Sequence, residues 1–217
     1  MVGEVQELIA NSVNFQYWYG NSFVRPLDSG ATKMYALLDR AFESVGRLGV
    51  PAIVQEFSEL MAEERFPSLQ NRTRNLAEIA QDGVGFAWSL AKNLKVKGNE
   101  ISLAGWLNSL VRRFPGYAQD LFLKRAFLFF AMLYHQMEWF KNDIRQMPIP
   151  VDYQIPKMLH WMGVLKYSNE LDKCVKEGIL ILSGSLMECE LRAASMIACK
   201  EIALRADCPM VDVDAYL

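Results

Sequence analysis

The stretch DLFLKRAFLFFAMLYHQMEWF, residues 120–140, decides the fold class. It is the longest and most apolar run of the chain, and it predicts a central buried helix from Asp120 to Phe140. Its most apolar part, Ala126 to Leu133, has polar or charged residues on both sides and is too short to cross a bilayer. We therefore expect a helix in the core of the protein and none in a membrane.

Helical periodicity also dominates the sequence on both sides of this stretch. Ile179 to Leu182, between Gly178 and Gly184, is a brief apolar run that suits either a strand or a loop. We therefore expect an all-α fold in which residues 1–217 form a single compact helical domain, either as one body or as two lobes around a pocket. The other expected helices cover residues 5–13, 32–45, 51–61, 69–79, 103–113, 155–165, 168–177 and 188–206.

The composition favours a small substrate over a long nucleic acid. The chain has 217 residues, of which 52% are hydrophobic and 22% charged, and its formal net charge is −2. Proteins that bind a duplex are usually basic, because contacts with phosphates supply most of the binding. A nucleic-acid partner is therefore expected only under the alternative function given below.

Cysteine and histidine are too sparse and too widely spaced for a typical zinc site, and no CxxC pair occurs. We expect no metal and no cofactor, and we expect free thiols in a reducing cytoplasm. The N-terminus lacks the basic residues and apolar run of a secretory signal. The residues concerned are Cys174, Cys189, Cys199, Cys208, His135 and His160.

The segment MPIPVDYQIPK, residues 147–157, holds one carboxylate in a stiff backbone. Its three prolines fix their own φ angles and restrict the residues before them. A single well-placed negative charge suits the cleavage of an N-glycosidic bond, in which the sugar becomes positively charged. Asp is also a favoured residue at the start of a helix, so Asp152 has two interpretations: a catalytic group or a cap of the following helix.

Six phrases follow one another along the chain: VNFQYW (13–18), FLKRA (122–126), VDYQIP (151–156), GVLKYS (163–168), ECELR (188–192) and VDVDAYL (211–217). In this order they resemble the queuosine salvage family, the queuosine 5′-phosphate N-glycosylase/hydrolases. The last phrase is similar to the family's Asp-x-x-Leu-Trp tail, and Gln154 stands where the family usually has arginine.

This resemblance implies a helical N-glycosylase fold and a metal-independent N-ribosyl hydrolase. Such an enzyme releases queuine, or a related 7-deazaguanine, from its nucleoside or 5′-monophosphate. Asp152 would stabilise the oxocarbenium-like state of the sugar and take a proton from the attacking water. Under the resemblance Phe15, Tyr17, Trp18 and Tyr153 would stack on the base, since aromatic faces suit planar heterocycles. Phe15 and Trp18, three apart at a possible helix end, also suit positions in the core.

The basic and acidic residues near these phrases have both structural and functional interpretations. Lys124 and Arg125 can lie at the rim of the central helix with their charges in water, or one of them can bind a 5′-phosphate. Glu188 suits the start of the last helix, whereas Glu190 and Arg192 are the expected substrate contacts, Glu190 at an amino edge of the base. Asp212 and Asp214 either orient site residues or make the tail soluble.

A second resemblance leaves the substrate open. The segment MPIPVDY (147–153) is also similar to the aspartate segment of archaeal 8-oxoguanine DNA glycosylases. Under that alternative Lys124 is a Schiff-base amine, which requires a lowered pKa. Gly83-Val84-Gly85 matches a DNA-binding hairpin only poorly. A third hypothesis is a helical module that binds a nucleoside without catalysis.

Overall fold

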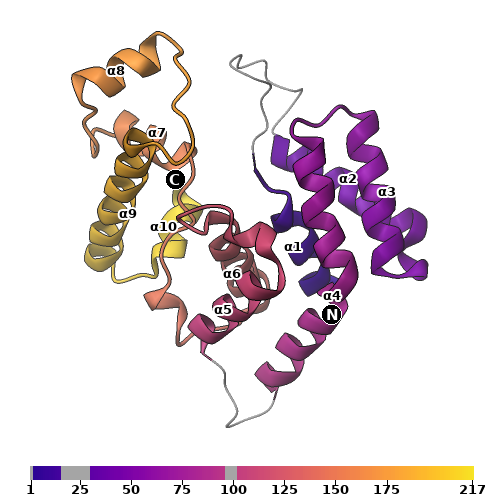
Figure 1. Cartoon of the computed structure of the whole chain (residues 1–217). Helices are drawn as coiled ribbons and strands as arrows, with labels where there is room; N and C mark the ends of the chain where they lie inside the picture. The colour runs from indigo at the N-terminus through magenta and orange to yellow at the C-terminus, as the bar shows by residue number, and fades with distance from the viewer. Residues whose placement is uncertain (1, 16–29, 96–101) are drawn as a thin grey trace.

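The computed structural model describes residues 2–15, 30–95 and 102–217. All regular structure in these ranges is helical (Figure 1), so the expected all-α class is confirmed. The helices are α1 (Val2–Ser12), α2 (Gly30–Val45), α3 (Val50–Glu63), α4 (Leu69–Lys95), α5 (Leu103–Arg113), α6 (Lys124–Met137), α7 (Gln154–Trp161), α8 (Asn169–Lys176), α9 (Leu186–Ala206) and α10 (Met210–Tyr216). Short 3₁₀ turns lie at Gly46–Leu48, Pro115–Ala118 and Ile144–Gln146.

The predicted central helix is shorter than expected. Asp120 to Phe140 was expected to form one helix, but α6 covers only Lys124 to Met137. Leu123 and Glu138 flank it in left-handed conformations, with φ angles of 49° and 58°. The Oδ2 atom of Asp120 accepts a hydrogen bond from the backbone N–H of Lys124 at 2.8 Å. Asp120 therefore lies before the helix and caps its first residue.

Conversely, α4 continues well past the predicted end at Ile79, and Gly83 and Gly85 lie within it. The prediction was wrong here because the apolar face continues through Phe86 and Leu90, both fully buried. A Cβ on Gly83 would lie 2.7 Å from Cγ2 of Ile79, one turn earlier in α4, whereas its distance of 3.5 Å to Cδ2 of Leu8 in α1 would be an ordinary contact. The segment Gly83-Val84-Gly85 is therefore part of a helix, which excludes it as a hairpin.

Among the other elements, residues 155–165 were expected to be helical, but α7 ends at Trp161 and Gly163 follows with a φ angle of 75°. Ile179 to Leu182 has no regular structure, and the short α10 was not predicted. The other predicted helices agree with α1, α2, α3, α5, α8 and α9 to within a few residues.

Two hydrophobic clusters organise the described residues. The larger one is built on α1 to α6, and the smaller one joins α7, α9 and the segment before α7. Helix α10 connects them, because Val211 belongs to the larger cluster and Val213 to the smaller. In Figure 1, α10 accordingly lies between α9 and α6. The assignment of residues 1–217 to a single domain stays a prediction.

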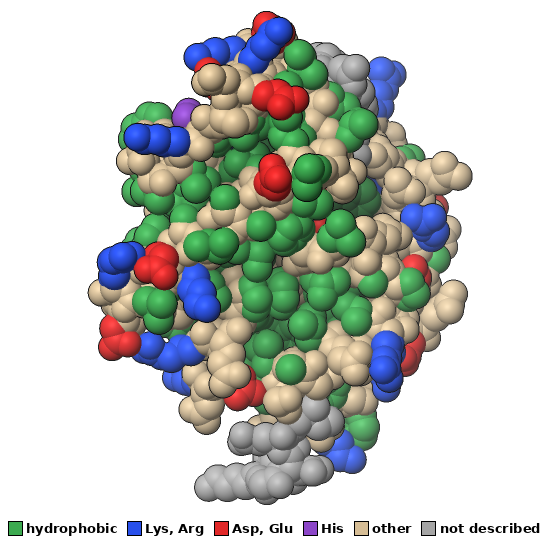
Figure 2. Space-filling model, turned by 60° about the vertical axis from the view of Figure 1, so that its left-hand side comes forward, with side chains coloured by type: hydrophobic (Ala, Val, Ile, Leu, Met, Phe, Trp, Pro, Cys, Tyr) green, Lys and Arg blue, Asp and Glu red, His purple; other side chains and the backbone are tan. Residues whose placement is uncertain are grey.

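The smaller cluster leaves much apolar surface uncovered. Figure 2, which turns the C-terminal side toward the viewer, shows hydrophobic side chains spread over this face. The exposed apolar side chains of this C-terminal region include Trp161, Met162, Ile179, Leu182, Leu186, Ile197 and Leu204.

Within the described ranges no helix is long and apolar enough to cross a membrane.

Candidate active site

An ion pair between Lys124 and Asp152 forms the centre of the candidate site. The Nζ atom of Lys124, at the start of α6, lies 3.4 Å from Oδ2 of Asp152, and the two side chains are only 13% and 31% exposed. The other oxygen, Oδ1, accepts the backbone N–H of Gln154 at 2.8 Å, where α7 begins. Asp152 therefore caps a helix and also presents one oxygen to a lysine.

The backbone that carries Asp152 passes between the two clusters. Met147 belongs to the larger cluster, whereas Ile149 and Val151 are buried in the smaller one. Pro148 and Pro150 alternate with these buried residues and limit the conformations of the segment. Since both its dihedral angles and its side chains are constrained, the segment holds Asp152 at a fixed place beside α6.

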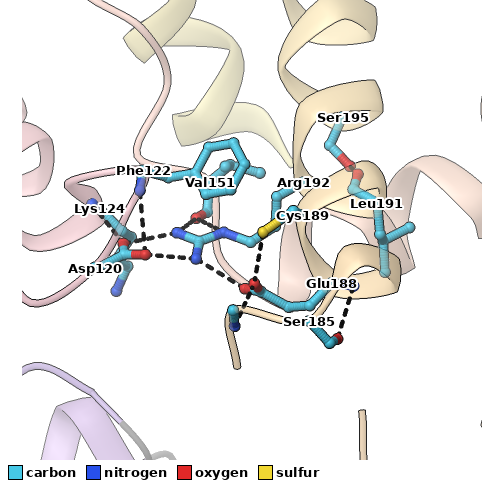
Figure 3. Close-up of polar contacts among 11 residues, drawn as sticks. Asp120, Phe122, Lys124, Val151, Ser185, Glu188, Cys189, Leu191, Arg192 and Ser195 are labelled. Atoms are coloured by element: carbon cyan, nitrogen blue, oxygen red, sulfur yellow. Dashed lines mark hydrogen bonds and ion pairs between the residues drawn. The ribbon is translucent and has the colours of Figure 1, made fainter. Parts of the chain in front are cut away.

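Arg192 of α9 connects this segment to the start of α6 (Figure 3). Its Nε and Nη2 atoms donate to the carbonyl oxygen of Val151 at 3.2 and 2.8 Å. Its Nη1 and Nη2 atoms donate to the two carboxylate oxygens of Asp120, both at 2.7 Å. Nη1 also donates to Oε1 of Glu188 at 2.9 Å, and the guanidinium lies 4.5 Å from the ring centroid of Phe122.

Asp120 uses both of its oxygens twice. Besides Arg192, Oδ1 accepts the backbone N–H of Phe122 at 3.3 Å and Oδ2 accepts that of Lys124 at 2.8 Å. Burial by itself would raise the pKa of Asp120, but the hydrogen bonds from Arg192 and from these backbone N–H groups together lower it below its ordinary value. The carboxylate is therefore held in its charged form.

Asp214, on α10, interacts electrostatically with the central pair. Burial, followed by the negative charge of Asp152, raises the pKa of Asp214 from 3.8 to about 6, while Lys124 and His135 act in the opposite direction. This carboxyl group is thus protonated in part near neutral pH. The sequence leaves two roles for Asp214, to orient site residues or to make the tail soluble, and its interaction with the charges of Asp152 and Lys124 favours the first.

On the other side of the first turn of α6, Arg125 points into the protein. It donates to the carbonyl oxygen of Ser12 at 2.6 Å and to that of Gly116. Its guanidinium lies 4.7 Å from the ring centroid of Phe15, and that of Arg72 lies 4.6 Å from the same centroid. Arg125 is only 5% exposed, so the expectation that its charge lies in water at the rim of the helix was wrong, whereas its binding of a 5′-phosphate stays a prediction.

The other predicted contacts are more dispersed. Tyr153, 46% exposed, follows Asp152 directly, and its pKa is raised by burial and by the charge of Asp152. Glu190 is exposed on α9, and Glu188, rather than Glu190, pairs with Arg192. Tyr17 and Trp18 lie outside the described residues, so their stacking on a base stays a prediction.

Two of these features were missed by the sequence analysis. The sequence predicts Asp120 as the first residue of the central helix, and nothing in its local sequence indicates Arg192, which is 72 positions away, as its partner. Arg192 was expected to bind substrate, but five donor contacts to Val151, Asp120 and Glu188 engage its guanidinium within the protein. Among the described residues, no group of three or more His, Cys, Asp or Glu side chains is arranged to hold a metal ion.

Most of this chain matches a known protein family. The family model described as "Queuosine salvage protein" matches residues 8–210, a range that includes Lys124, Asp152 and Arg192 but ends before Asp214.

Curated relatives carry the name queuosine 5′-phosphate N-glycosylase/hydrolase. The protein from Mus musculus is 32% identical over 105 residues, which are 43% of this chain and 31% of the relative. That from Dictyostelium discoideum is 25% identical over 205 residues, or 87% of this chain and 62% of the relative. The protein from Sphaerobacter thermophilus is 24% identical over 218 residues, which are 90% of this chain and 67% of the relative. The chain thus spans about two thirds or less of the length of these relatives.

Proposed function

Since this chain belongs to the queuosine salvage protein family, we propose that it hydrolyses the N-glycosidic bond of a queuosine nucleotide and releases the 7-deazaguanine base. The observation that carries the proposal is the Lys124–Asp152 pair, in which a carboxylate with one capped oxygen is held against a nearly buried amine. The names of the relatives support the 5′-phosphate as substrate. Metal independence and a cytoplasmic location are parts of the same proposal.

The reaction needs a fixed anion near the sugar. As the bond from C1′ to the base nitrogen breaks, its electron pair leaves with the base and positive charge grows on the ribose. The Asp152 carboxylate stabilises this charge and accepts a proton from the water that attacks C1′. Lys124 keeps that carboxylate in place through their contact of 3.4 Å.

The leaving base needs a proton of its own. A general acid works best when its pKa lies near the working pH. Asp214 is suited to this role, because burial and the charge of Asp152 raise its pKa to about 6. Two carboxyl groups with different protonation states would then divide the work, with Asp152 as the base and Asp214 as the acid.

The test is release of free base from queuosine 5′-phosphate, followed by mass spectrometry. Replacing Asp152 by Asn should lower the rate by about 10²- to 10⁴-fold, the usual contribution of a positioned acid–base group. Asp172→Asn is the matched control, since Asp172 lies on α8 in an exposed pair with Lys176. Full activity of Asp152→Asn would contradict the mechanism.

The alternative, an 8-oxoguanine-type DNA glycosylase, is favoured by one observation: the amine of Lys124 is only 13% exposed, and removal from water is one way in which a nucleophilic lysine is activated. An 8-oxoguanine duplex incubated with borohydride would then trap a covalent adduct that disappears in Lys124→Ala. No product in either assay would support the non-catalytic nucleoside-binding module.

A further inference from the structure

Arg192 lies at the junction of three segments that are far apart in the sequence. It is on α9, and it binds the carbonyl oxygen of Val151, whose next neighbour is Asp152. It also binds the carboxylate of Asp120, which in turn accepts the backbone N–H of Lys124. Asp152 is thus connected to this guanidinium through the carbonyl group that precedes it, and Lys124 through its backbone N–H and the carboxylate of Asp120.

The donors of Arg192 are all engaged by these contacts. A guanidinium has five N–H donors, and five contacts of 2.7 to 3.2 Å direct them to Val151, Asp120 and Glu188. The side chain is only 10% exposed. Direct binding of a substrate would require Arg192 to give up at least one of these partners, so the geometry favours a role inside the protein.

The geometry of the contacts also requires an arginine. Both nitrogens at its end meet both oxygens of Asp120 at 2.7 Å, a bidentate arrangement, while Nε and Nη2 share the Val151 carbonyl. The ring of Phe122, 4.5 Å from the guanidinium carbon, restricts the plane of the group. A lysine keeps the charge but is a point donor, so it cannot reproduce both connections at once.

We propose that Arg192 and Asp120 form a clamp that positions Lys124 against Asp152 for the reaction. Arg192 and Asp120 are positioning residues in this arrangement, and Lys124 and Asp152 are the residues that meet the substrate. The inference rests on the proposed function for the identity of the reaction, but the clamp itself is a property of the folded protein. It can therefore be tested both with and without substrate.

The test with substrate compares Arg192→Lys with wild type on queuosine 5′-phosphate. We expect kcat to fall by about 10²-fold, as a displacement of about 1 Å in a catalytic group does, while KM changes little. The matched control is Arg205→Lys, on the same helix, where the arginine is exposed and pairs with Glu201 one turn away. A rise in KM with unchanged kcat would overturn the inference and make Arg192 a substrate contact.

The test without substrate measures how fast the amine of Lys124 reacts with an acylating reagent, by peptide mass spectrometry. A lysine held against a carboxylate reacts slowly, and Asp152→Asn defines the rate when that partner is lost. Arg192→Lys should raise the rate toward that of Asp152→Asn, and Arg205→Lys should leave it at the wild-type value. Unchanged labelling in Arg192→Lys would overturn the clamp.

The two tests separate the two proposals. If wild type releases no base but Arg192→Lys frees Lys124 for labelling, the proposed function fails and the clamp stands.

If Arg192→Lys does not fold, Asp120→Asn replaces it, because this change keeps the shape of the side chain and removes one of the two oxygens that pair with Arg192. The same loss of kcat and the same rise in Lys124 labelling are then expected, and wild-type values for both would overturn the inference.

Discussion

The strength of the Lys124–Asp152 pair can be predicted from its geometry. At the observed separation of 3.4 Å, two unit charges attract by about 1 kcal/mol in a water-like dielectric and by about 5 kcal/mol at an effective dielectric constant of about 20. The cost of removing both charges from water opposes this attraction, and Asp152 is still 31% exposed. We therefore expect a net coupling free energy of about 1–2 kcal/mol, above the range of most surface pairs.

A double-mutant cycle measures this coupling. Lys124→Met, Asp152→Asn and the double variant are unfolded in urea, and the coupling is the departure of the double variant from the sum of the single effects. Asparagine keeps an oxygen that can accept the N–H of Gln154, so the helix cap survives in Asp152→Asn.

The control for the cycle is the pair of Lys176 and Asp172 on α8. These residues lie one turn apart, with side chains 73% and 36% exposed, and such pairs contribute about 0.3–0.5 kcal/mol. If the coupling between Lys124 and Asp152 is no larger than that of this exposed pair, the reasoning that the site holds a preorganised ion pair is refuted.

Three further predictions concern other groups. Because the folded protein raises the pKa of Asp214 from 3.8 to about 6, it binds a proton there that the unfolded chain has already released. This group therefore makes the free energy of unfolding fall as pH rises from about 4 to about 6. Urea unfolding at a series of pH values should show that Asp214→Asn removes this component, and an unchanged pH profile would contradict the raised pKa of Asp214. Gly116→Ala should lower the free energy of unfolding by about 1–3 kcal/mol, as measured by thermal or urea unfolding. The reason is that the Cβ of the new alanine would lie 2.6 Å from Oδ1 of the buried Asn75. Wild-type stability of the variant would mean that Asn75 can move away. Burial raises the pKa of the Cys199 thiol to about 11, so iodoacetamide at pH 8 should label Cys199 far more slowly than Cys174, and equal rates by mass spectrometry would contradict its burial.

Part of the site was visible in the sequence. Asp152 lies in a segment whose prolines limit its backbone, and Lys124 lies just before the most apolar part of the predicted central helix; both signals are local. The structure brings these two residues together, but the spacing of 28 positions between them carries no information about which way each side chain faces. For the same reason the sequence does not indicate that Glu188 pairs with Arg192, while the expected contact of Glu190 with the base stays a prediction.

Local sequence determined where most helices of this protein lie. Apolar residues at helical spacing predicted most of them, and Ser168 and Ser185 cap α8 and α9 as their side chains suggest. Tertiary structure alone decided the clamp, in which Arg192 meets Val151 and Asp120 from 41 and 72 positions away. The physical reason is that helix propensity and capping act over a few residues, whereas contacts between helices depend on how whole apolar faces pack. Where α9 packs against the segment before α7, a guanidinium finds partners that no local pattern could indicate.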